Sequence, residues 1–316
     1  MATRTGPRPP QYRRRSTTPR ARLIILFENS QATAFKPETV TKFVAELEAK
    51  GFAVKRVAPT SAHDMTISAS DARTARPWAL VAAGGDGAVN LVARTLVGSP
   101  IRLGILPLGK CNNIFRSLVG EPSPAAALKV ISEGGARMID CGKVAGQPFF
   151  GSIALGLLPQ MAEELKGRAL PKLGLGWSHL ASRASASVRR ERTGIKIDSM
   201  KFEASPLTLS VNLLPYSVSL QLAPSAILDD QRFEITIDNE TSSEPLSKFI
   251  RAVFKKKYIY HDEIRVFRGQ EISLGPVKGR TLYLDGELIT IPTNTIDVTF
   301  YPTRLRAFAH GASKED

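Results

Sequence analysis

Residues 80–90 read Leu-Val-Ala-Ala-Gly-Gly-Asp-Gly-Ala-Val-Asn, an apolar run that ends in three glycines around one aspartate. The pattern predicts a buried strand over residues 78–83, a sharp turn at residues 84–87 and a helix that begins near Val89. Glycine permits close backbone approach to a ligand, and the amides of a first helical turn attract anions such as phosphate. A negatively charged carboxylate that faces phosphate implies either a metal ion between the two groups or a proton that the carboxylate transfers. Asp86 therefore makes this turn a candidate site of phosphoryl transfer.

A second glycine turn follows the next predicted strand, residues 101–106. Residues 107–113 read Pro-Leu-Gly-Lys-Cys-Asn-Asn. In a parallel sheet both turns lie at the carboxyl ends of strands, where open α/β folds bind their ligands. We therefore expect one mononucleotide crevice, in which Gly109 lets the backbone approach the nucleotide, Asn112 hydrogen-bonds it and Lys110 contacts phosphate. The alternative is a pair of purely structural turns.

Around these turns the predicted elements alternate, which indicates a parallel sheet covered by helices. The expected strands are residues 23–27, 52–57, 78–83 and 101–106, and the expected helices are residues 37–50, 71–76, 89–97, 112–118 and 124–133. Beyond residue 137 the pattern changes to short β segments, interrupted by a mainly helical stretch at residues 156–193. Those β segments are residues 138–144, 149–154, 194–197, 201–203, 207–214, 217–222, 232–238, 263–268, 271–274, 281–284 and 296–301.

These patterns divide the chain into four parts. We expect a disordered basic tail over residues 1–21, a nucleotide-binding α/β domain over residues 22–145 and a β-rich domain over residues 146–302. The remaining residues, 303–316, form a C-terminal tail that can return to the first domain.

The composition favours a cytoplasmic protein. Hydrophobic residues make up 43% and charged residues 23% of the chain, as in ordinary globular proteins. The longest apolar runs are far shorter than the roughly 20 residues that span a bilayer, and they are too short for a signal peptide. Two cysteines, Cys111 and Cys141, are too few for a disulfide framework. The four histidines show no spacing typical of metal ligands.

The net charge of +14 is concentrated at the N-terminus, where residues 1–22 contain seven arginines and no acid. Such a tail can hold a protein at the periphery of an anionic membrane, with about 1 kcal/mol from each basic residue near the surface. A solvated tail without a partner is the alternative. Nucleic acid would also attract the charge, but no helix-turn-helix, zinc-finger or RNA-recognition pattern occurs, so we expect no nucleic-acid partner.

A third block lies in the expected β domain, where residues 284–287 read Leu-Asp-Gly-Glu. By itself, Asp-Gly-Glu is most simply a hairpin turn with solvated acids. Beside a phosphate-binding crevice, the same carboxylates can supply what phosphoryl transfer to a hydroxyl still lacks. The hydroxyl needs a base within hydrogen-bond reach, and Mg²⁺ needs oxygen ligands.

Together these blocks resemble the diacylglycerol kinase catalytic-domain superfamily, which includes bacterial lipid kinases, sphingosine kinases and ceramide kinases. The similar positions are residues 84–87 with Asn90, residues 106–109 with Asn112, Phe115 and Arg116, residues 284–287 and, more weakly, residues 223–230. The resemblance extends over about residues 22–302. It implies a three-layer, NAD kinase-like α/β domain followed by a mainly antiparallel, β-sandwich-like domain, with ATP in the cleft between them.

The resemblance also implies an ATP- and Mg²⁺-dependent lipid kinase that phosphorylates a hydroxyl of diacylglycerol or a related lipid. The general base would be Asp285, Glu287 or Asp86, and the sequence leaves the choice open. Asp230 would be a ligand of a structural Mg²⁺. The positions expected to bind the nucleotide are Asn29, Thr60, Gly84, Gly85, Asp86, Gly87, Asn90, Gly109, Lys110 and Asn112.

Several positions depart from the family pattern. Residues 29–33 lack the proline and glycine that usually follow the first strand, Ala88 and Lys110 stand where threonines are usual, and Gln231 replaces a glycine. The ammonium of Lys110 can offset lost hydroxyl contacts electrostatically. These changes support a second hypothesis, a non-catalytic relative that binds nucleotide or anionic lipid. An NAD kinase shares the Gly-Gly-Asp-Gly turn but fits residues 106–112 poorly. The sequence specifies neither the lipid nor the oligomeric state.

Overall fold

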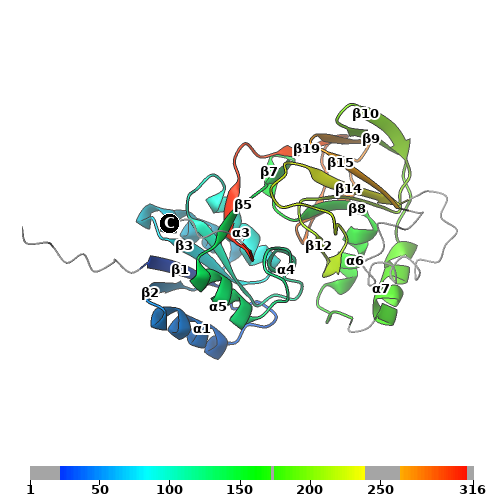
Figure 1. Cartoon of the computed structure of the whole chain (residues 1–316). Coiled ribbons are helices and arrows are strands. Elements are labelled where there is room, and N and C mark those ends of the chain that lie inside the picture. The colour runs from blue at the N-terminus through cyan, green and yellow to red at the C-terminus, as the bar shows by residue number, and fades with distance from the viewer. Residues whose placement is uncertain (1–21, 172–173, 239–263, 312–316) are drawn as a thin grey trace, which may run out of the picture.

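The computed structural model describes residues 22–171, 174–238 and 264–311. The predicted basic tail and the last five residues lie outside the described residues. Figure 1 shows two bodies side by side, with the α/β domain at one end and the β-rich domain at the other. This architecture confirms the predicted fold class. No helix within the described ranges has the length and apolar character needed to cross a membrane.

The first domain is a six-stranded sheet in the order β2-β1-β3-β4-β20-β5. Its first four strands are parallel, whereas the C-terminal strand β20 pairs in parallel with β4 and antiparallel with β5. The central strands β3 and β4 are almost wholly buried, while the edge strand β2 is half exposed. The six strands are β1 (Arg22–Glu28), β2 (Phe52–Val57), β3 (Ala79–Gly84), β4 (Arg102–Pro107), β5 (Ala136–Ile139) and β20 (Leu305–Phe308).

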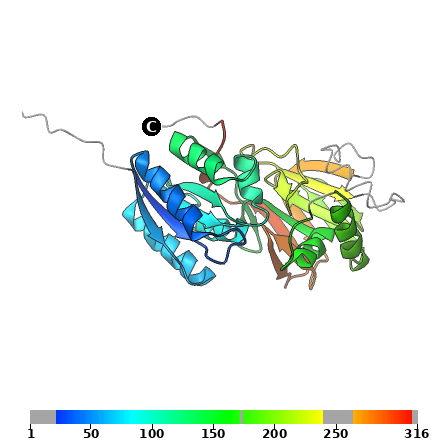
Figure 2. The ribbon, with the colours of Figure 1, turned by 90° about the horizontal axis from the view of Figure 1, so that it is seen from below.

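Helices cover both faces of this sheet (Figure 2). The helix α1 packs beside α5, and α2 packs beside α3. The apolar side chains of these helices meet those of the central strands in one core. The helices are α1 (Pro37–Ala49), α2 (Ala62–Ala72), α3 (Asp86–Leu96), α4 (Asn113–Leu118) and α5 (Pro124–Glu133).

Two sequence predictions in this domain are wrong. The helix expected at residues 71–76 is α2, which begins nine residues earlier at Ala62 and is followed by a 3₁₀ turn at Arg73–Ala75. The Ser61 side chain accepts a hydrogen bond from the Asp64 amide and caps this helix. Only two residues of α2 are buried, which explains its weak periodic pattern. The next helix, α3, begins at Asp86 rather than near Val89, because Gly85 caps it and an acid at its first position suits the helix dipole.

The second domain contains two antiparallel sheets, in the orders β10-β9-β16-β19-β6-β7 and β15-β14-β11-β8-β17-β18. The first comprises β6 (Gly142–Val144), β7 (Gln147–Phe149), β9 (Thr193–Ile197), β10 (Met200–Ala204), β16 (Ile272–Gly275) and β19 (Ile296–Phe300). The second comprises β8 (Ser152–Gly156), β11 (Thr208–Asn212), β14 (Phe233–Asp238), β15 (Ile264–Gly269), β17 (Thr281–Leu284) and β18 (Glu287–Thr290). The strands β18 and β20 were not predicted from the sequence.

Smaller elements complete this domain. The helices α6 (Leu157–Leu165) and α7 (Gly174–Ala186) pack on each other and share an apolar cluster with Tyr283 of β17. A short hairpin, β12 (Tyr216–Ser217) and β13 (Leu220–Gln221), contacts α4 of the first domain. The described chain crosses between the domains twice, from β5 to β6 and from β19 to β20. Two chain segments therefore connect the domains.

Candidate functional site

The two glycine turns lie against each other at the carboxyl edge of the first sheet. The Leu108 amide donates a 2.9 Å hydrogen bond to the Gly84 carbonyl. A Cβ atom added at Gly109 would lie 2.2 Å from the Gly85 Cα, and one added at Gly85 would lie 2.9 Å from the Gly109 Cα. No side chain fits between these backbones, so their contact requires glycine at both positions. Gly87, in contrast, is exposed and has open space around it.

Asn112 closes its own turn. Its backbone adopts the left-handed conformation with φ 50°. Its side-chain oxygen accepts a 3.0 Å hydrogen bond from the Gly109 amide, and its Nδ2 donates a 2.8 Å hydrogen bond to the Gly109 carbonyl. Both polar groups of this buried side chain are therefore engaged within the turn, where they shape the loop that was expected to meet a nucleotide.

Asp86 is the first residue of α3 and lies at the domain boundary. Its carboxylate accepts hydrogen bonds from the Asn113 side-chain amide at 3.2 Å and from the Ile114 backbone amide at 3.1 Å. Burial raises the pKa of Asp86, and the neighbouring N–H groups of α4 act against that rise. A carboxylate that lies at a cavity and has a raised pKa is a stronger proton acceptor than an ordinary aspartate.

Asp285, unlike Asp86, is directed away from the cavity and into the protein backbone. Together with Gly286 it forms the two-residue turn between β17 and β18, and both residues have positive φ, 50° and 101°. This is the hairpin for which Asp-Gly is a strong signal. The Asp285 side chain is not solvated, however, since the residue is 6% exposed. Its carboxylate accepts backbone hydrogen bonds of 2.7–2.8 Å from Phe150, Gly151 and Ser152. Burial raises the pKa of Asp285 to about 6 despite these donors.

Asn90 and Asn113 connect the two domains. Asn90 is fully buried in α3, and its Nδ2 donates a 3.2 Å hydrogen bond to the backbone carbonyl of Asp285. Asn113 holds Asp86 and also accepts a 2.8 Å hydrogen bond from the Ser219 amide of the second domain. The sequence did not identify Asn113 as a site residue, because its part in the site consists of contacts between distant segments.

A cavity of about 650 Å³ opens between the domains beside Asp86. The first domain contributes Asp86, Gly87 and Lys110, and the second contributes Tyr283 and residues 286–289. The Nζ of Lys110 donates a 2.6 Å hydrogen bond to the Leu165 carbonyl at the end of α6. Polar groups therefore line the side near α3. Apolar groups also line the cavity, from Ala162, Leu165, Val218, Leu288 and Ile289. The α6 segment also adds Glu163 and Lys166, which form a 3.7 Å ion pair.

Glu287 is another carboxylate of the cavity, and its side chain is 42% exposed. Its nearest cation is the Arg94 guanidinium of α3, at 3.7 Å. Among the three carboxylates that the sequence left open as a base, Asp86 and Glu287 line the cavity. Asp285 does not, and its oxygens are directed at the backbone of residues 150–152.

Asn29 and Thr60 lie at the same edge of the sheet but do not line this cavity. The Asn29 side chain accepts a 3.1 Å hydrogen bond from the Gln31 amide, and its Cβ lies against Gly84. The Thr60 amide and hydroxyl both donate to the Asp64 carboxylate, at 2.8 and 3.1 Å, next to the start of α2. Their observed contacts support the loops that follow β1 and β2.

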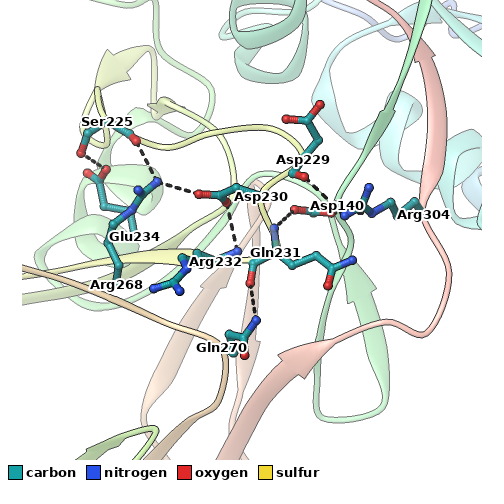
Figure 3. Close-up of polar contacts among 10 residues, drawn as sticks. All are labelled: Asp140, Ser225, Asp229, Asp230, Gln231, Arg232, Glu234, Arg268, Gln270 and Arg304. Atoms are coloured by element: carbon teal, nitrogen blue, oxygen red, sulfur yellow. Dashed lines mark hydrogen bonds and ion pairs between the residues drawn. The ribbon is translucent and has the colours of Figure 1, made fainter.

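Asp230 does not fit the metal site that was expected of it. One carboxylate oxygen forms a 2.9 Å ion pair with Arg268, and the other accepts a 3.0 Å hydrogen bond from the Arg232 amide (Figure 3). The neighbouring acids are likewise neutralised, Asp229 by Arg137 at 2.8 Å and Asp140 by Arg304 at 2.9 Å. The part of the chain that the structure describes contains no group of three or more His, Cys, Asp or Glu side chains able to hold a metal ion.

Comparison with known proteins agrees with this geometry. Residues 22–144 match the model of the diacylglycerol kinase catalytic domain, and residues 151–309 match that of the YegS C-terminal NAD kinase beta sandwich-like domain. The chain is 25% identical to a diacylglycerol kinase of Staphylococcus saprophyticus over 277 residues, covering 85% of this chain and 89% of that one. It is 27% identical to a diacylglycerol kinase of Staphylococcus aureus over 273 residues, covering 84% and 85% of the two chains.

Two solved structures share the fold. A diacylglycerol kinase from Bacillus anthracis superposes with a TM-score of 0.70 at 17% identity, covering 92% of this chain and 97% of the other. An NAD kinase from Archaeoglobus fulgidus, solved in complex with ATP, superposes with a TM-score of 0.50 at 10% identity, covering 92% and 94%. The resemblance seen in the sequence is thereby confirmed, and the chain belongs to the diacylglycerol kinase family, with a catalytic domain of that type followed by a YegS-type C-terminal domain.

Proposed function

We propose that the protein transfers the γ-phosphoryl group of ATP to a lipid hydroxyl in the cavity between the two domains. The observation that carries the proposal is the character of this cavity, whose lining combines three carboxylates (Asp86, Glu163 and Glu287) and two lysines (Lys110 and Lys166) with several apolar side chains. A phosphorylated nucleotide suits the charged groups, and the glycerol or sphingoid end of a lipid suits the apolar groups. The volume of about 650 Å³ lies within the range of small-molecule sites, roughly 300–1,000 Å³.

The nucleotide side is built from backbone and one cation. The first amides of α3 lack intrahelical acceptors and carry the positive end of the helix dipole. Gly87 leaves them accessible, because no side chain stands beside it. Lys110 adds a positive charge at the cavity wall, where its Nζ donates to the Leu165 carbonyl. ATP, when bound there, would supply the phosphoryl group, and these residues would hold and orient its phosphates.

For the carboxylates we propose three different roles. Asp86 accepts the proton of the attacking hydroxyl, since it lines the cavity and its pKa is raised. Glu287 lines the same cavity and keeps a largely free carboxylate, so it is the candidate to hold Mg²⁺ together with nucleotide phosphates. The ion would neutralise phosphate charge. Asp285 is a positioning residue that fixes the hairpin carrying Glu287.

The non-catalytic alternative rests on the substitutions at Ala88 and Lys110. Ala88 is buried, and a Cβ atom at Gly84 would lie 2.7 Å from the Ala88 Cβ. Its side chain therefore faces the turn and does not line the cavity. The missing hydroxyl removes no group from the cavity wall, and Lys110 adds one. Both observations favour the enzyme.

The proposal is tested by incubating the protein with Mg²⁺, ATP labelled at the γ-phosphate and a panel of diacylglycerol, monoacylglycerol, ceramide and sphingosine in detergent. We expect label in at least one lipid, and the labelled lipid identifies the substrate. Binding of ATP measured by calorimetry without transfer to any lipid would contradict the proposal and support the non-catalytic alternative. Asp297→Asn, an exposed substitution on β19, serves as the control variant that keeps wild-type transfer.

A further inference from the structure

A second cavity lies at the opposite edge of the first sheet. It has a volume of about 690 Å³ and is lined by the segments that lead into β3 and β4, residues 73–78 and 99–102, together with Ser70 of α2. The glycine turns follow the other ends of the same two strands. Six residues of strand separate the two edges by about 20 Å. This cavity is therefore separate from the cavity beside Asp86.

The lining of this second cavity is strongly basic. Arg73 and Arg76, from the turn after α2, and Arg102, from the start of β4, line the same space, and no aspartate or glutamate is among the lining residues. Arg73 and Arg76 are exposed and form no ion pair with any residue that the structure describes. Some other exposed arginines pair with acids, as Arg168 does with Glu164 at 3.1 Å.

Trp78 also lines this cavity and is approached by two guanidinium groups. The guanidinium carbons of Arg22 and Arg102 each lie 5.1 Å from the centroid of the Trp78 ring, within the range of cation–π interactions. Arg102 is among the residues that line the cavity, whereas Arg22 is not. An anion in this cavity would interact favourably with the guanidinium groups of Arg73, Arg76 and Arg102.

The backbone at Arg76 supports the same interpretation. Arg76 is a non-glycine residue in the left-handed conformation, with φ 46°, and its amide donates a 2.9 Å hydrogen bond to the Arg73 carbonyl. Most residues adopt this conformation only at an energetic cost, and such residues are found at functional sites more often than elsewhere. The tight turn places Arg73 and Arg76 at the same cavity.

We propose that this cavity is a second binding site, for a phosphate ester. Guanidinium groups match phosphate oxygens with paired hydrogen bonds, and a phosphate monoester offers enough oxygens for arginines that approach from several directions. The volume admits a phosphorylated small molecule or the headgroup of a phospholipid. Phosphate is the chemistry common to both sources.

Trp78 provides a local reporter for this proposal. The chain has two tryptophans, and the other, Trp177, is buried in α7 of the second domain. In the Trp177→Phe protein the tryptophan emission therefore reports on the second cavity. We expect a saturable change in this emission on titration with glycerol 3-phosphate, or with phosphatidylcholine vesicles that contain phosphatidic acid. Glycerol and pure phosphatidylcholine vesicles are the matched uncharged probes and should give no change.

The arginines are tested in the same background. Arg73→Gln with Arg76→Gln should raise the dissociation constant at least about tenfold, because two charge-assisted contacts are lost. Both side chains are exposed, so the fold should persist, as checked by circular dichroism. The control pair is Arg189→Gln with Arg265→Gln, which removes the same charge from exposed positions of the second domain and should leave binding within about twofold of the parent.

Each outcome decides one point. A response to glycerol 3-phosphate alone identifies a soluble ester as the ligand, and a response to the acidic vesicles identifies a lipid headgroup. Absence of a response to both probes overturns the proposal. So does binding that the Arg73 and Arg76 substitutions leave unchanged, or that the control pair weakens equally, since both would show general charge attraction rather than a site.

Discussion

The turn at residues 84–87 and the hairpin at residues 284–287 both place an aspartate next to a glycine at the domain boundary. Asp86 lines the cavity and meets two N–H donors of α4. Asp285 lies outside the lining and accepts three backbone N–H groups from residues 150–152. The two carboxylates thus have similar sequence settings and different surroundings. Burial raises the pKa of both, so the pKa alone does not separate a proton acceptor from a positioning residue.

The largest expected effect concerns Asp86. Asp86→Asn keeps an oxygen that can accept from α4 but removes the group that takes the proton, so lipid phosphorylation should fall by about 10²- to 10⁴-fold. The measurement is transfer of γ-phosphate label, with circular dichroism and calorimetric ATP titration as checks on fold and binding. If activity stays within tenfold of wild type while ATP binding is retained, Asp86 is not the base and the contrast with Asp285 fails.

For Asp285 the expected effect is on stability. Asp285→Asn replaces one acceptor oxygen with an NH₂ group facing backbone donors, which should lower the free energy of unfolding by about 1–3 kcal/mol. Urea denaturation at neutral pH measures the change. Asp297→Asn, at an exposed site on β19, should change the same quantity by less than about 0.5 kcal/mol. An Asp285→Asn protein as stable as the control would contradict the structural role.

The pH dependence of the rate separates the two aspartates directly. Asp86 accepts a proton only when ionised, and its pKa is raised from the ordinary value of 3.8. The rate should therefore fall as the pH is lowered, with a midpoint above 3.8. This acid limb should persist in Asp285→Asn if it belongs to Asp86. Its disappearance in that variant would assign the limb to Asp285, whose pKa is about 6.

The smallest expected effect concerns a third acidic turn, residues 229–231. The Asp230 carboxylate is neutralised by Arg268 and not by a cluster of acids around a metal. A chelator added to the ATP-free protein should therefore shift the melting temperature by less than about 1 °C, as measured by calorimetry, since a metal that binds only the folded state would otherwise raise it. A fall of several degrees that added Mg²⁺ reverses would restore the metal site.

Local sequence patterns were sufficient for most of the first domain. The strand before Gly84 and the helix at residues 124–133 were predicted because apolar residues, proline and glycine act within a few positions. The same reasoning failed at α2, which buries only Met65 and Ala69 and so has little periodic signal. It also failed at β20, because the position of this strand between β4 and β5 depends on partners that are distant in the chain.

The sequence by itself determined the alternating α/β domain, the β-rich second domain and the glycine and acidic blocks of the candidate site, since these follow from short-range patterns. Only the tertiary structure decided what each polar side chain does. In the folded protein, the Asn112 side chain hydrogen-bonds within its own loop, and the buried Asn90 side chain donates to the Asp285 carbonyl. Asp230 forms an ion pair with an arginine. Hydrogen bonding and charge act over a few ångströms in space, and sequence spacing does not specify those distances between remote segments.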